Sequence, residues 1–259
     1  MPDDITISLH LGYGSRWYKI PQAVKLDMLG IAIQPKSHEK FYHGAAVGVV
    51  ENQKAVITLV GVNKDYPPTD KEGFADFAAS LDQPIIQQLI QRLKPVSPIY
   101  GYRAANRLRP YHKMRSYPAN YFVLGDAYCA FNPIYGQGMM VAAMSAKRLK
   151  EYLFGHNDID LSTRNFQKRL FWTVLISWLL AIGEDMRYPS VTGKKPNIID
   201  RVAHRFLDFL FIASNRDQFV GVTLLQVVQR IKSPLYLANP ILLILAFFAV
   251  LFGKSQTIA

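Results

Sequence analysis

The residues best suited to chemistry lie in one stretch, residues 121–149, with the sequence YFVLGDAYCAFNPIYGQGMMVAAMSAKRL. The apolar run 121–124 predicts a short strand inside a parallel sheet. Asp126 would then lie at its carboxyl end, where open α/β sheets bind ligands. A turn at 132–135 leads to Gly136-Gln137-Gly138, where the backbone can pass close to a ligand and begin a helix. The first N–H groups of that helix would face the same ligand and favour negative charge on it.

Asp126 and the helix start together indicate a ligand with hydroxyl groups and an oxygen that becomes anionic. A carboxylate accepts hydrogen bonds from sugar-like hydroxyls, and a helix N-terminus stabilises negative charge. A reduced flavin has a polyhydroxyl ribityl chain and develops charge at the N1–C2=O edge of its ring. An ordinary strand–loop–helix connection with a capping aspartate would explain isolated glycines. The set spacing of Gly, Asp, Pro, Gly and Gly between Gly125 and Gly138 is more specific than that.

The segment 125–143, GDAYCAFNPIYGQGMMVAA, resembles the GD motif of flavin monooxygenases related to para-hydroxybenzoate hydroxylase, commonly GDAAHxxxPxxGQG. It is similar as well to the corresponding motif of squalene epoxidases. Cys129 and Asn132 stand where the commoner pattern has His and Pro. The resemblance implies that Asp126 binds the ribityl chain, that Pro133 lies beside the isoalloxazine, and that residues 136–139 bind its pyrimidine edge through backbone amides. The FAD-binding residues so implied are Gly125, Asp126, Pro133, Gly136, Gln137, Gly138 and Met139.

Three further segments, YGSRWYKIP, NRLRPYHKM and GEDMRYP, resemble a bacterial subgroup of FAD-dependent hydroxylase-like proteins, so the similarity extends to about Pro189. The family implies hydroxylation or epoxidation of an apolar organic substrate through a flavin hydroperoxide, with NAD(P)H as the reductant. The cofactor would carry that chemistry. No catalytic role is therefore assigned to His10, His43, His112 or Arg103, and Cys129 is interpreted as a packing residue. A polyprenoid reductase of the geranylgeranyl type and a non-catalytic, membrane-associated binding domain are the alternatives.

The first half of an FAD site, a βαβ unit with GxGxxG, is absent from the sequence. Gly12-Tyr13-Gly14 is the only GxG near the start, and it follows an alternating pattern typical of a strand. We therefore expect this chain to be incomplete as an FAD site by itself. A truncated product, half of a split enzyme with an upstream partner, a homo-oligomer and a domain that has lost FAD all remain open.

The order of elements predicts an α+β fold. The period-two pattern that starts at Ile5 predicts a first strand, and short polar connections favour antiparallel pairing. Thr69 or Asp70 is expected to cap a helix. The expected architecture is an antiparallel substrate-domain sheet, the C-terminal remnant of an FAD-binding α/β domain, and a helical tail. The expected domains are 1–118, 119–156 and 157–259. The remaining expected elements are strands at 28–35, 44–51, 55–63 and 99–103, with the polar connection 51–54, and a helix at 85–93.

The amino-acid composition limits the kinds of partner that the chain is expected to bind. The 259 residues include 30 Lys and Arg against 19 Asp and Glu, a net charge of +11, which favours a phosphate-bearing cofactor or an acidic membrane surface. No basic run interleaved with aromatic residues and no nucleic-acid-binding module is present, so nucleic acid is not an expected partner. Cys129 is the single cysteine, which excludes an intrachain disulfide and a thiolate metal cluster. The acidic N-terminus does not resemble a signal peptide, which predicts a cytoplasmic protein.

Two apolar segments, 170–182 and 241–252, are shorter than the roughly 18 residues that a membrane-spanning helix needs. The first is expected to be a buried helix. For the second, a buried helix and a surface anchor that enters one leaflet are both open, so a peripheral membrane contact through 241–252 is one expected interaction.

Overall fold

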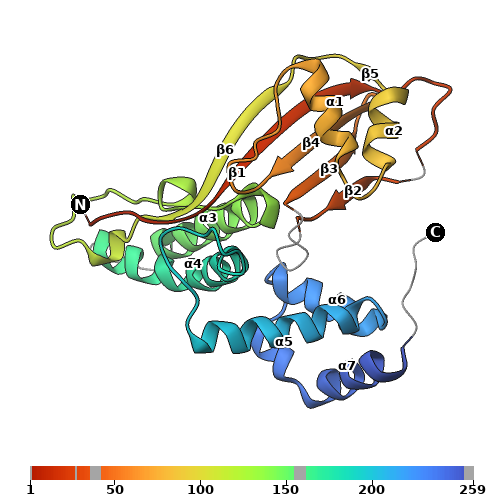
Figure 1. Cartoon of the computed structure of the whole chain (residues 1–259). Coiled ribbons are helices and arrows are strands. Elements are labelled where there is room, and N and C mark those ends of the chain that lie inside the picture. The colour runs from red at the N-terminus through yellow and green to blue at the C-terminus, as the bar shows by residue number, and fades with distance from the viewer. Residues whose placement is uncertain (1, 27, 36–41, 155–161, 254–259) are drawn as a thin grey trace. The chain divides into compact units, whose positions relative to one another are not determined.

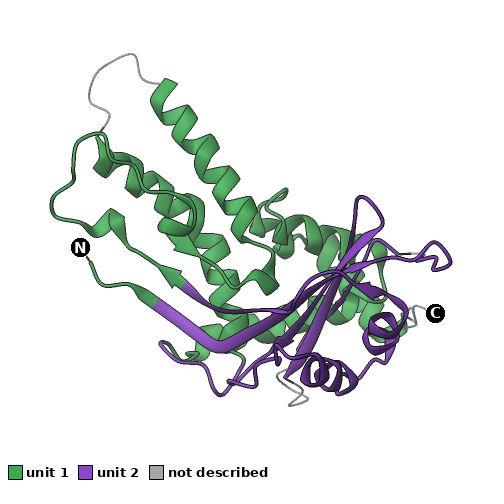
Figure 2. Cartoon of the chain, turned by 90° about the horizontal axis from the view of Figure 1, so that it is seen from above, with its two compact units in different colours: residues 1–5, 107–187, 194–259 green, residues 6–106, 188–193 purple. Residues whose placement is uncertain are grey.

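The computed structural model describes residues 2–26, 28–35, 42–154 and 162–253 (Figure 1). It has two compact units, coloured separately in Figure 2: unit 1 is Met1–Ile5, Arg107–Arg187 and Lys194–Ala259, and unit 2 is Thr6–Asn106 and Tyr188–Gly193. Helices and an antiparallel sheet make the chain an α+β protein, as the sequence predicts. The predicted domain boundary at 156 lies outside the described residues, and the division at 1–118 and 119–156 remains a prediction.

Unit 2 is built on the sheet, whose neighbouring strands follow the order β2-β3-β4-β1-β6, with β5 beside β1. The β3–β4 pair is an antiparallel hairpin in the register Val50↔Lys54, and Asn52 and Gln53 adopt positive φ in its turn. The predicted hairpin connection is therefore confirmed. The strands are β1 (Ile5–Lys19), β2 (Gly30–Ile33), β3 (His43–Val50), β4 (Lys54–Gly61), β5 (Lys94–Pro95) and β6 (Tyr100–Leu108).

One face of this sheet is covered by two helices, α1 (Lys71–Ala79) and α2 (Ile85–Arg92) (Figure 1). Of the two predicted caps, Asp70 is the one used: its carboxylate accepts a hydrogen bond from the Gly73 N–H at 2.8 Å. The core between helices and sheet combines inward side chains of the strands with those of the helices, among them Tyr18, Ile57, Leu59, Phe74, Phe77, Ile86 and Leu89.

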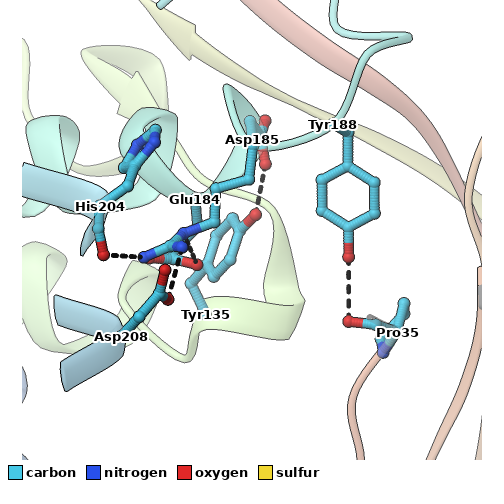
Figure 3. Close-up of polar contacts among 8 residues, drawn as sticks. Pro35, Tyr135, Glu184, Asp185, Tyr188, His204 and Asp208 are labelled. Atoms are coloured by element: carbon cyan, nitrogen blue, oxygen red, sulfur yellow. Dashed lines mark hydrogen bonds and ion pairs between the residues drawn. The ribbon is translucent and has the colours of Figure 1, made fainter. Parts of the chain in front are cut away.

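Gly12 and Gly14 lie inside β1, which confirms that Gly12-Tyr13-Gly14 belongs to a strand. A Cβ at Gly12 would come within 2.2 Å of the Tyr66 ring, and one at Gly14 would come within 3.0 Å of Pro67. These glycines therefore serve the close packing of the segment that precedes α1. Residues 188–193 complete unit 2. Tyr188 donates a hydrogen bond to the Pro35 carbonyl at 2.9 Å (Figure 3), and the backbones of Thr192 and Ser8 pair as a short antiparallel bridge.

Unit 1 contains the segment 121–149. Its last strand pairing joins Arg107 and Leu108, at the end of β6, to β7 (Cys129–Ala130). Helix α3 (Gly138–Phe154) packs against α4 (Thr163–Asp185) and against the turn Gly125–Ala127.

The predicted strand at 121–124 is wrong: these residues form no strand in the structure. A strand exists only where a neighbouring strand accepts and donates its backbone hydrogen bonds, and none of the described strands lies beside this run. The run instead leads into a 3-10 turn.

Three helices, α5 (Ile198–Ser214), α6 (Gln218–Val228) and α7 (Pro240–Phe252), form a small cluster within unit 1. The apolar run 170–182 lies in α4 and buries Leu170, Val174 and Trp178 among others, as the sequence predicts. The run 241–252 lies in α7, which buries Leu242, Ala246 and Ala249 and leaves its other side exposed. None of the helices in the described ranges combines the length and apolarity that crossing a bilayer requires.

Candidate functional site

The first part of the predicted site is the 3-10 turn Gly125–Ala127. Gly125 has φ +61°, a left-handed conformation that favours glycine, and a Cβ there would lie 3.9 Å from Ala142 of α3. The small side chain of Ala142 thus lets the turn approach the helix. Asp126 follows at the exposed corner of the turn, and its carboxylate makes no hydrogen bond or ion pair with any described residue.

The second part is the 3-10 turn Pro133–Tyr135, closed by Gly136 at φ +63°. The N–H of Gly136 bonds back to the Pro133 carbonyl at 3.0 Å, and the Val141 N–H bonds to the Gln137 carbonyl at 3.0 Å as α3 begins. The N–H groups before Val141, at Gly138 and Met139, have no intrahelical acceptor, because no earlier turn of α3 supplies a carbonyl to them. These amides belong to the residues that the sequence predicts to bind an anionic oxygen.

Gly138 is unlike Gly136, because nothing in the described structure requires it. It has no left-handed φ, and a Cβ added to it would meet no atom within 4 Å. Pro133 is exposed, and Met139 is 88% exposed. Gly138 therefore keeps open a space beside the helix N-terminus that a side chain would enter.

Gln137 does not face that space. Its side chain is buried, and its Nε2 donates to the Tyr135 carbonyl and to the Val228 carbonyl at the end of α6, each at 3.3 Å. The side chain thus supports the turn from inside the protein. Of the predicted residues, Gln137 is the one whose side chain is committed to the fold.

A buried aspartate holds the second turn from the other side, and sequence reasoning missed it. Asp185, the last residue of α4, is fully buried and accepts a hydrogen bond from the Tyr135 hydroxyl (Figure 3). It also accepts one from Nδ2 of the buried Asn132, at 3.2 Å. We call Asn132, Tyr135 and Asp185 the brace. It spans 53 residues of sequence, and the acidic pair that follows the apolar run of α4 was its only signal.

Next to the brace, Arg187 ties the end of α4 to α5. Its guanidinium forms ion pairs with Glu184 at 2.9 Å and with Asp208 at 2.7 Å, and it donates to the His204 carbonyl at 3.3 Å. Burial raises the pKa of the Glu184 carboxyl, while the charge of Arg187 acts in the opposite direction. Figure 3 shows Glu184 of α4 and Asp208 of α5 turned toward each other at these ion pairs. The cluster fixes the end of the helix that carries Asp185.

The residues between the two turns are packed inward. Cys129 is buried, and burial together with the nearby Asp126 carboxylate raises the pKa of its thiol, which suits the predicted packing role. Tyr128 is also buried, and its hydroxyl lies 3.0 Å from Nδ1 of His112. Within the described ranges, no three His, Cys, Asp or Glu side chains are grouped as the ligands of a metal ion would be.

No family model matches the sequence. The chain is 26% identical over 157 residues to the protein Rv3254 of Mycobacterium tuberculosis, a match that covers 60% of this chain and 32% of that protein. The chain therefore spans about a third of the length of this curated relative.

Solved structures with the same fold include flavin-dependent proteins. A flavoprotein/dehydrogenase from Cytophaga hutchinsonii superposes with a TM-score of 0.60 at 15% identity, over 93% of this chain and 55% of that one. The flavin-dependent halogenase CmlS gives 0.56 at 14% identity, over 82% and 41%. HpxO of Klebsiella pneumoniae, in complex with FAD and uric acid, gives 0.54 at 14% identity, over 98% and 55%. The chain spans about half of each, and at these identities the likeness shows the fold alone.

Proposed function

We propose that this chain supplies the half of an FAD site that holds the ring and ribityl chain, in a flavin-dependent monooxygenase that acts on an apolar substrate. One feature carries the proposal: the fold leaves Asp126 and Gly138, which we call the rim, without a structural role. Asp126 has no partner among the described residues, the space beside Gly138 at the start of α3 is open, and the turn that holds Asp126 packs against α3. A carboxylate and a helix N-terminus together match a ligand with hydroxyls and a developing negative charge.

The residues present fit that part of the cofactor. Asp126 would accept hydrogen bonds from ribityl hydroxyls, and the amides of residues 136–139 would bind the pyrimidine edge of the ring. The exposed ring of Pro133 would lie beside the isoalloxazine. When bound, the flavin supplies two-electron chemistry between NAD(P)H, oxygen and substrate. The helix N-terminus would favour the anionic reduced ring over the neutral oxidised one.

The nucleotide half of the cofactor needs other residues, because the sequence contains no GxGxxG segment. We therefore place that half of the site on residues outside this sequence. The flavin-dependent enzymes of the same fold, which extend well beyond the matched region, support this division.

A titration with riboflavin, FMN and FAD, followed by quenching of flavin fluorescence, tests the proposal. Because this chain would contact only the ring and ribityl chain, the three ligands should bind it with similar affinity. Asp126→Ala should weaken all three about ten- to a hundredfold, the effect of losing a charged hydrogen-bond acceptor. Asp3→Ala is the matched control, since Asp3 is also exposed and has no described partner. Equal affinity in wild type and Asp126→Ala would mean that Asp126 does not contact the flavin.

Product analysis separates the monooxygenase from the polyprenoid-reductase alternative. With isotopically labelled O2 and NAD(P)H, the proposed monooxygenase incorporates label into its organic product. Saturation of a double bond without incorporation would instead assign the reductase activity.

A further inference from the structure

Helix α7 is apolar on every side but covered on only one. Its thirteen residues, PILLILAFFAVLF, include no charged side chain. Leu242, Ala246 and Ala249 pack into the core of the α5–α7 cluster. The outer face, as we call the opposite side, consists of six large apolar residues that are each more than half exposed: Ile241, Ile244, Phe247, Phe248, Leu251 and Phe252. A contiguous face of this kind marks an interaction site.

Cations flank both ends of α7. Near its start, Lys232 lies 5.3 Å from the ring centroid of Tyr236, in the 3-10 turn Pro234–Ala238 that contacts the helix. At its end, Nη1 of Arg216 donates to the Val250 carbonyl at 2.6 Å. Tyr and Lys side chains of this kind are enriched where apolar helices meet the headgroup layer of a bilayer.

The acidic residues of the α5–α7 cluster are already engaged. Asp200 closes the capping box of α5, Asp208 pairs with Arg187, and Asp217 caps α6. By contrast, Lys195, Arg201, Arg205 and Lys232 form no ion pair with any described residue. The cluster therefore carries uncompensated positive charge, of which Lys232 lies near the start of α7.

We propose that the outer face of α7 docks onto an anionic membrane surface, lying in the plane of one leaflet. At thirteen residues the helix is about 20 Å long, which is too short to cross a hydrocarbon core of about 30 Å but suits an interfacial position. Anionic headgroups would neutralise the free cations. A symmetric contact with a second copy would instead bring the same cations of two chains together. The proposal does not depend on flavin binding.

Co-sedimentation with phosphatidylcholine vesicles, with and without phosphatidylglycerol, tests this surface. Wild type should pellet with the anionic vesicles, more weakly at high salt, and little with the neutral ones. The double variant Ile244→Glu, Phe248→Glu should lower vesicle affinity about tenfold or more, because two inserted apolar side chains become charged. Lys232→Glu should lower affinity for anionic vesicles only. Leu29→Glu is the matched control, since Leu29 is 87% exposed but lies in unit 2.

Circular dichroism of each variant checks folding, and the milder Phe248→Gln replaces the double variant if the latter loses helix. Light scattering without vesicles reports the oligomeric state. Loss of vesicle binding in the α7 variants, with Leu29→Glu unchanged, supports the membrane surface. No pelleting of wild type with anionic vesicles overturns it, as does a dimer that the α7 variants dissociate without any vesicle binding.

Discussion

Two aspartates near the predicted cofactor segment have opposite environments. Asp185 is fully buried and accepts hydrogen bonds from Asn132 and Tyr135, whereas Asp126 is exposed and has no partner among the described residues. A buried carboxylate must be satisfied by protein groups, so Asp185 is explained by the fold. The fold does not explain Asp126. We therefore expect a ligand to contact this carboxylate.

The two glycines at the end of the same segment repeat the contrast. Gly136 is required by its left-handed φ, and Gly138 is required by nothing in the described structure. The brace and Gly136 thus shape the turn, while the fold gives Asp126 and Gly138, the two residues of the rim, no structural role. Substitutions on the brace should change stability, and substitutions on the rim should change ligand binding.

The largest effect is expected for Asp185→Ala. Removing the carboxylate takes away an acceptor that Nδ2 of the buried Asn132 shares with the half-buried Tyr135 hydroxyl. At about 1–3 kcal/mol for each hydrogen bond lost, we expect a loss of about 3 kcal/mol in the free energy of unfolding. Urea denaturation measures it, and Tm should fall by roughly 6 °C or more.

Asp126→Ala is the matched variant for that comparison, with an expected change within about 0.5 kcal/mol. Hydrogen exchange at the amides that follow Pro133 should accelerate in Asp185→Ala and stay unchanged in Asp126→Ala. An Asp185→Ala protein as stable as wild type would remove the distinction between brace and rim.

A smaller effect is expected at the glycines. Gly136→Ala forces a Cβ into a left-handed conformation, which costs about 1–2 kcal/mol although the space around it is open. Gly138→Ala has no such penalty and should leave stability unchanged or raise it by up to about 1 kcal/mol. Thermal unfolding of the two variants measures the difference. Equal losses in both would mean that Gly138 also serves the fold.

How far the sequence predicts this structure depends on the range of each interaction. The 51–54 hairpin connection and the Asp70 cap are local signals, and both are confirmed. The brace joins residues 53 positions apart, and no local pattern marks which acidic residue will be buried. The prediction of a strand at 121–124 was wrong for the same reason. A strand forms only beside a pairing strand, and the local sequence does not show whether one is present.

The apolar runs 170–182 and 241–252 show the same limit of prediction from local sequence. Both predict helices, and both are helical, but only the packing of α4 and α7 reveals which sides are covered. The left-handed conformations of Gly125 and Gly136 are typical of glycine in turns. That Gln137 points inward, between two glycines of the motif, depends on the carbonyl of Val228, 91 residues away.

The smallest expected effect is a dependence of stability on pH. It arises at His112, which contacts the buried Tyr128 of the segment 121–149. Burial, and then the charge of Lys113, lowers the pKa of His112 below its ordinary value. Burial raises the pKa of Tyr128, so its hydroxyl stays protonated at 3.0 Å from Nδ1 of His112, where it can donate a hydrogen bond to a neutral imidazole. The folded state thus prefers the neutral imidazole, while the unfolded chain binds a proton near pH 6.5.

The stability due to neutral His112 is therefore present above about pH 6.5 and is lost as the pH falls toward the lower pKa of the folded state. Because His112 is only partly buried, we expect a contribution below about 1 kcal/mol. His112→Gln should reduce the fall in Tm between about pH 7.5 and 5. An unchanged pH profile in His112→Gln would show that other groups carry the acid sensitivity.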